Sequence, residues 1–132
     1  MRLAVAASLA AVLAACAPRP GSSSGASTTA SGQPVPGVVP APVAQRLVEE
    51  GARVVDVRTP QEFAAGHVPG AVNIPFDQLG ARASELGDPS QPVVLYCRWG
   101  RRSGIAAETL RGLGFGKVYD FQRYSDWPDA AQ

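Results

Sequence analysis

The sequence has 132 residues, which suits one domain, and its 45% apolar content is typical of a chain that builds a hydrophobic core. Twelve basic and eleven acidic residues nearly cancel, which leaves a formal net charge of +1. This balance excludes the broadly basic surface of many nucleic-acid-binding proteins, and we expect no nucleic-acid partner.

The first fifteen residues have the features of an export signal. A positive charge at Arg2 precedes an apolar run over residues 3–15, which is too short to span a bilayer as a helix. The run ends Leu-Ala-Ala before Cys16 and resembles the lipobox of bacterial lipoproteins. This resemblance implies cleavage before Cys16, lipidation of its sulfur, and anchoring in the cell envelope on the periplasmic or extracytoplasmic face. The alternative is an ordinary secretory signal that leaves Cys16 as a free thiol.

Residues 16–37 are predicted to form a flexible linker. Ser, Thr, Gly, Pro and Ala dominate this stretch, which cannot bury enough apolar surface to fold. We therefore expect a lipoprotein signal peptide at 1–15, a lipidated cysteine and linker at 16–37, and one folded domain at 38–130. We expect the domain to be a monomer that reaches the membrane only through its lipid anchor.

The folded part alternates short apolar strands with helices. Strands are predicted at 38–39, 53–57, 72–74, 93–97 and 116–120, and helices at 42–50, 60–65, 75–86 and 103–114. Thr59 and Glu62 have the spacing of a capping box at the start of the second helix. The alternation predicts an α/β fold with a small, mostly parallel central sheet and helices on both faces. Ligands bind beyond the carboxyl ends of the strands in such sheets.

A lone cysteine, Cys97, ends the strand at 93–97. The next five residues carry three arginines, one glycine and no acidic residue, and a predicted helix follows. Helix N-termini and nearby cations favour bound anions and the thiolate, which is the nucleophilic form of cysteine. With Cys16 lipidated, Cys97 has no partner for a disulfide. The loop therefore predicts a reactive thiol in an anion-binding site; the alternative is an inert, buried cysteine.

Four other polar residues have predicted roles. Asp56 ends the strand beside the presumed pocket, where it orients a loop arginine or accepts backbone amides; we favour the second, structural role. Arg58 and Glu62 have i, i+4 spacing and are expected to form a surface pair. His67, the only histidine, is expected to hydrogen-bond the backbone, with a catalytic base as the alternative. One thiol and one histidine do not make a metal ligand set, so we expect no metal and no cofactor.

Two separate motifs resemble those of rhodanese domains. Residues 55–75 contain VDVRTPQEF and GHVPGAVNIP, which are similar to the N-terminal signature of that family. Residues 97–103, CRWGRRS, are similar to its active-site loop, C-x-x-G-x-[RS]-S. The resemblance spans residues 38–121. It implies a rhodanese-like fold and a thiosulfate sulfurtransferase similar to the exported single-domain forms.

The resemblance also implies a two-step reaction through a persulfide on Cys97. The thiolate takes a sulfur from thiosulfate or a persulfide, and a thiol or cyanide then removes it. The implied substrate-binding residues are Arg98, Trp99, Gly100, Arg101, Arg102 and Ser103 of the loop, together with Asp56 and Arg58. Arg102 is expected to lead in attracting the anionic donor, and the other two loop arginines support it. Trp99 is expected to form a wall of the pocket mouth or a docking surface for a protein partner.

Two other functions remain open. A non-catalytic binding module would present Trp99 and the arginines to an anionic partner at the cell envelope. A phosphatase or arsenate reductase would use a C-x5-R loop, which is one residue longer than the spacing from Cys97 to Arg102. The chain also departs from the family pattern after Phe121, where the usual Gly-Gly pair is absent. Trp127 is expected to pack as the family tryptophan does.

Overall fold

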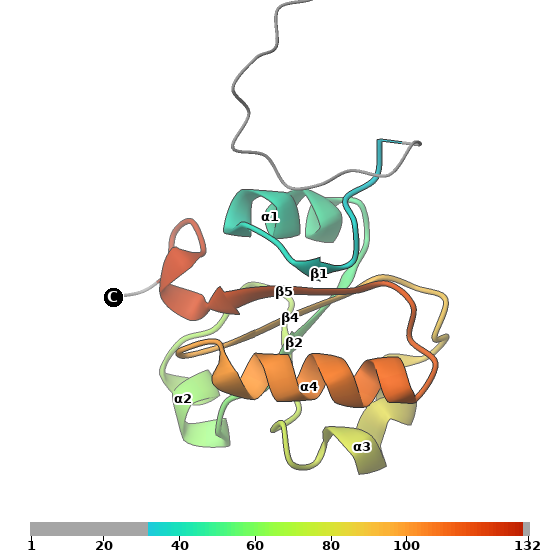
Figure 1. Ribbon diagram of the computed structural model, residues 1–132. Helices are drawn as coiled ribbons and strands as arrows, with labels where there is room; N and C mark the ends of the chain where they lie inside the picture. Colours follow the sequence, from blue (N-terminus) through green and yellow to red (C-terminus); the bar gives the residue numbers. More distant parts are fainter. Residues whose placement is uncertain (1–31, 131–132) are drawn as a thin grey trace, which may run out of the picture.

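All strand pairings in the sheet are parallel, as the alternation of strands and helices predicted. The computed structural model describes residues 32–130, which form five strands in the order β1-β5-β4-β2-β3 (Figure 1). The strands are β1 Gly37–Val38, β2 Arg53–Asp56, β3 Val72–Asn73, β4 Val93–Cys97 and β5 Val118–Arg123. The central position of β4 places its carboxyl end, and Cys97 with it, between the ends of two neighbouring strands.

Helices cover both faces of the sheet. The α-helices are α1 Ala41–Glu49, α2 Pro60–Ala65, α3 Leu79–Arg82 and α4 Arg101–Gly112, and the 3-10 helices are η1 Ala83–Leu86 and η2 Tyr124–Asp126. Figure 1 shows α1 on one face of the sheet and α3 and α4 on the other. This confirms the predicted α/β class with a small parallel sheet between two helical layers.

Strand β4 is buried along its whole length because both its faces are covered. Its side chains alternate between two hydrophobic clusters, as the two-residue period of a strand requires. Val93, Leu95 and Cys97 pack in the cluster under α3 and α4. Val94 and Tyr96 pack in the cluster under α1. The alternation therefore fixes which face the thiol occupies: Cys97 points toward α4.

The predicted boundaries differ most around the cysteine loop. Helix α4 begins at Arg101, two residues before its predicted start, because Gly100 serves as its N-cap with φ of 92°. Strand β5 runs to Arg123 rather than ending at residue 120. A bulge in β5 puts Gln122 at φ of 71°, and its N–H donates to the Asp120 carboxylate at 2.8 Å. The cysteine loop is therefore shorter than predicted, and β5 lies beside it.

The folded part begins earlier than the predicted boundary at residue 38. Gly37 pairs with Tyr119 in the sheet, and the Tyr119 hydroxyl donates to the Pro34 carbonyl at 3.2 Å. The end of the predicted linker is therefore part of the domain. Cys16 and the apolar run before it lie outside the described residues. Within residues 32–130, no helix has both the length and the apolar character needed to cross a membrane.

Candidate active site

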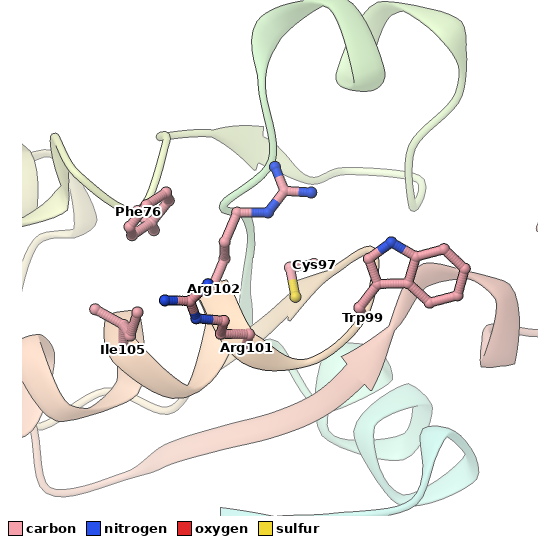
Figure 2. Close-up of a pocket in the computed structure, with 6 residues that line it drawn as sticks. All are labelled: Phe76, Cys97, Trp99, Arg101, Arg102 and Ile105. Carbon is pink, nitrogen blue, oxygen red and sulfur yellow. The ribbon is translucent and has the colours of Figure 1, made fainter.

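Cys97 is the last residue of β4, and its sulfur lies at the floor of a cavity. The Gly100 N–H donates to the Cys97 Sγ at 2.8 Å. Figure 2 shows the sulfur between Arg101 and Trp99. Cys97 is buried as a whole and packs in the core cluster, and it is also a lining residue of the cavity. The cavity therefore lies directly over the buried thiol.

Gly100 shapes the loop that holds its own amide against the sulfur. Its φ of 92° is one that L side chains rarely adopt, and a Cβ placed there would lie 3.2 Å from the Gln122 Cβ. The Ser103 hydroxyl donates to the Gly100 carbonyl at 3.1 Å. Ser103 is buried, so this bond is shielded from water. The positive φ of Gly100 and the bond to its carbonyl hold this residue in the conformation in which its N–H points at the Cys97 sulfur.

Gly100→Ala is expected to lower kcat/KM for the sulfur transfer that the sequence resemblance implies by about 10²-fold, because the loop must shift and withdraw an N–H from the reacting sulfur. Steady-state kinetics measures the effect. Gly104→Ala is the matched control, since Gly104 lies within α4 and a Cβ there meets no atom within 4 Å. Equal activities in the two variants would contradict this role for the Gly100 amide.

The cavity over Cys97 is called here the sulfur pocket. Its volume is about 410 Å³, and it is lined by Phe76, Cys97, Trp99, Arg101, Arg102 and Ile105 (Figure 2). Two cationic side chains and apolar walls around one thiol suit a small anionic substrate. Sequence reasoning missed two of these residues. Ile105 could have been found because it lies four residues after Arg101 on the same helix face, whereas Phe76 gave no signal.

The three loop arginines have different surroundings. Arg102 donates to both carboxylate oxygens of Glu62, at 2.8 and 3.1 Å, and so joins α4 to α2. Arg101 lines the sulfur pocket, and Arg98 lies over the Trp99 ring. Neither has an acidic partner within residues 32–130. Arg101, rather than the expected Arg102, is therefore the cation in the sulfur pocket whose charge is uncompensated.

The free energy of unfolding should fall at acid pH as the Glu62 carboxylate becomes protonated. The hydrogen bond from Arg102 lowers its pKa from 4.5 to about 2. Because the folded-state pKa is the lower one, the ionised carboxylate stabilises the fold above pH 4.5, and this contribution is lost as pH falls through about 2. Over that pH range, the free energy of unfolding of Glu62→Gln, measured in urea, is expected to fall less than that of the unaltered protein.

Glu108→Gln, at an exposed position of α4, is the control and is expected to keep the pH dependence of the unaltered protein. If Glu62→Gln also kept it, the ion pair would be contradicted.

Asp56 and Arg58 form a buried pair beside the site. The Asp56 carboxylate accepts bonds from the Arg58 guanidinium, the shortest at 2.6 Å, and from the Arg58 N–H at 2.9 Å. It also accepts the Tyr96 hydroxyl at 2.8 Å. The expected surface pair of Arg58 with Glu62 is wrong, because Arg58 turns back onto Asp56 and is only 5% exposed. Asp56 does not line the sulfur pocket, and it accepts a backbone amide, in keeping with the structural role favoured for it.

A second cavity lies beside the first and is called here the side pocket. It has a volume of about 420 Å³ and is lined by Arg58, Glu62, Ala65, Gly66, Arg98, Trp99, Tyr124 and Ser125. Trp99 belongs to both cavities and is 73% exposed. It thus forms a pocket wall, as expected, but a wall shared by two pockets. The side pocket could not be predicted because its lining comes from three separate parts of the chain, residues 58–66, 98–99 and 124–125.

The two remaining predictions concern the side chains of His67 and Trp127. His67 Nδ1 lies 2.9 Å from the Phe63 carbonyl oxygen, and its ring stacks on Phe63, so the predicted backbone hydrogen bond is confirmed. His67 lines neither the sulfur pocket nor the side pocket. Trp127 is buried and packs on Phe121, with ring centroids 5.2 Å apart. The end of β5 is therefore anchored by aromatic packing.

The family model described as Rhodanese-like domain matches residues 40–124. The chain is 40% identical over 81 residues to a thiosulfate sulfurtransferase, GlpE, of Pseudomonas syringae, which covers 61% of this chain and 76% of that one. It is 46% identical over 71 residues to the Bacillus subtilis protein YqhL and spans only 56% of that relative. It spans 37% of another B. subtilis relative, which is named putative sulfur carrier protein YrkF.

The fold also resembles solved structures. A human single-domain sulfurtransferase superposes with a TM-score of 0.58 at 30% identity, covering 64% of this chain and 87% of that one. An E. coli rhodanese solved with anions gives a TM-score of 0.56 at 33% identity, covering 59% of this chain and 95% of that one. Both superpositions cover more than half of the chain.

Proposed function

Because the chain belongs to the rhodanese-like domain family, we propose that it is a sulfurtransferase that carries a sulfane sulfur on Cys97. The observation that supports this most strongly is the Gly100 N–H bonded to the Cys97 sulfur at the floor of the sulfur pocket. A backbone donor held by a rigid loop stabilises negative charge on sulfur without reorganising during the reaction. Relatives named as thiosulfate sulfurtransferases support thiosulfate as the donor.

In the first step, the Cys97 thiolate attacks the outer sulfur of thiosulfate. A new S–S bond forms to Cys97, the S–S bond of thiosulfate breaks, and sulfite leaves with the electron pair. Arg101 lines this pocket, and its guanidinium has no acidic partner within the described chain. It is therefore the group available to bind the sulfonate oxygens of the donor and of the departing sulfite.

In the second step, a thiolate or cyanide attacks the outer sulfur of the Cys97 persulfide. The new bond joins that sulfur to the acceptor, and the Cys97 thiolate leaves with the electrons of the broken S–S bond. The Gly100 amide then bonds to the same sulfur anion with which the cycle began. Residues 1–31 are proposed to hold this domain at the cell envelope through a lipid on Cys16, as their sequence pattern predicts.

The activity is tested by measuring thiocyanate formed from thiosulfate and cyanide by the purified domain. We expect turnover with parallel lines in double-reciprocal plots, since the donor product leaves before the acceptor reacts. A phosphate ester and arsenate serve as controls and are expected to be left unchanged. Hydrolysis of the ester without thiocyanate formation would contradict the proposal.

A further inference from the structure

Arg98 is a cation in the lining of the side pocket that has no negative charge beside it in that lining. Arg58 is neutralised by the buried Asp56 carboxylate, and Glu62 by the Arg102 guanidinium. Arg98 has no acidic partner within residues 32–130, and its guanidinium carbon lies 5.3 Å from the centroid of the Trp99 ring. The pocket therefore has the charge to bind one singly negative group next to an exposed indole.

The side pocket also lies close to where the persulfide sulfur would sit. Trp99 lines both cavities, and the Glu62–Arg102 ion pair has its carboxylate in one lining and its guanidinium in the other. Figure 2 shows Trp99 on one side of the Cys97 sulfur and Arg101 on the other. A molecule in the side pocket is thus separated from the sulfur pocket by the Trp99 side chain.

We infer that the side pocket binds the carboxylate of the sulfur acceptor, a small thiol that carries one carboxylate group. This inference deepens the proposed function and rests on it. The donor must place its sulfur against Cys97. Because Cys97 lines the sulfur pocket and not the side pocket, the donor occupies the sulfur pocket. The acceptor must reach only the outer persulfide sulfur, which extends from Cys97 into the sulfur pocket beside Trp99. Arg98 then binds the carboxylate while the thiolate end passes the indole.

The transfer step balances with these two molecules alone. The acceptor thiolate forms a bond to the outer sulfur of the Cys97 persulfide, the Cys97 S–S bond breaks, and its electron pair stays on the Cys97 thiolate. The acceptor leaves as a persulfide that still carries its carboxylate. No oxidant or reductant is needed, because the sulfane sulfur keeps its oxidation state when it moves between two thiolates.

Binding is tested first with a probe that cannot react, 3-(methylthio)propionate, followed through the indole N–H resonance of Trp99. We expect saturable shifts with the carboxylate probe and none with its alcohol analogue, 3-(methylthio)propanol. Arg98→Gln is expected to weaken binding by about tenfold, since it removes one charge-assisted hydrogen bond. Equal binding of the acid and the alcohol, or unchanged affinity in Arg98→Gln, would overturn the inference.

A carboxylate introduced into the pocket wall tests the charge of the side pocket. Ser125 is exposed and lines the side pocket but not the sulfur pocket. Ser125→Glu is expected to raise KM for 3-mercaptopropionate about tenfold and to raise KM for 2-mercaptoethanol much less. Ser90→Glu adds the same charge to the exposed loop before β4, outside both pockets, and is expected to change neither KM. Equal effects on both thiols would overturn the inference.

The two proposals fail in distinguishable ways. If thiosulfate leaves Cys97 unmodified, the proposed function fails, while binding of the non-reacting carboxylate can still be measured. If the persulfide forms and 3-mercaptopropionate reacts no better than 2-mercaptoethanol in the unaltered protein, the side pocket is not the acceptor site and only the inference fails.

Discussion

Cys97→Ser is expected to abolish sulfur transfer from thiosulfate to cyanide, with a loss of at least about 10³-fold. The hydroxyl that replaces the thiol is not ionised near neutral pH, and an oxygen cannot hold the second sulfur as a persulfide. Thiocyanate formation under saturating thiosulfate and cyanide measures the effect. The variant should fold, because serine is slightly smaller than cysteine and the Gly100 N–H stays close enough to bond to its oxygen.

Cys97→Ala is the companion variant, since it removes the nucleophile without burying a new hydroxyl. Both variants should keep the circular dichroism spectrum of the unaltered protein and lose activity together. The binding-module alternative predicts instead that the function of the protein in cells survives both substitutions, because presentation of Trp99 and the arginines to a partner does not require a thiol. Retained sulfur transfer in both variants would contradict the role of Cys97 as the sulfur carrier.

Asp56→Ala is expected to lower the free energy of unfolding by about 3–5 kcal/mol, the usual cost of breaking a buried ion pair by removing one partner. The Asp56 carboxylate is fully buried, and Arg58 is 5% exposed, so the guanidinium would keep a buried charge without its counter-charge. The Tyr96 hydroxyl would also lose its acceptor. Urea unfolding followed by fluorescence measures the difference.

The exposed pair of Arg82 and Glu85 provides the control for this prediction. Its side chains are 38% and 51% exposed, so water already solvates both charges. Glu85→Gln is expected to leave the urea midpoint unchanged, whereas Asp56→Ala lowers it strongly. If the two variants had similar midpoints, the Asp56–Arg58 pair would not be holding the end of β2 in place.

Local signals were enough to predict most of the fold. The strand at 93–97 could be placed because five consecutive residues suited burial on both faces, and all five are buried. The start of α2 was predicted from the Thr59–Glu62 spacing, and the capping box is present. The start of α4 was misplaced because Gly100 was interpreted only as a loop residue. A glycine at positive φ can also cap a helix, and that assignment depends on β5 packing against it.

The site was predictable only where its parts are close in sequence. Cys97, Gly100 and the arginines fall within six consecutive residues, so their proximity could be inferred. The Arg102–Glu62 pair joins residues forty positions apart, and no local pattern indicates such a pairing. Arg58 was assigned to Glu62 by helical spacing, but Arg58 precedes α2 and its side chain turns back to the strand end at Asp56. Tertiary contacts, not propensities, decided both partners.

The most direct test is the intact mass of the domain after incubation with excess thiosulfate and removal of small molecules. The account predicts a gain of one sulfur atom, located on Cys97 by peptide mapping, reversed by cyanide, and absent in Cys97→Ala. A folded domain whose Cys97 keeps its original mass under these conditions would contradict the account.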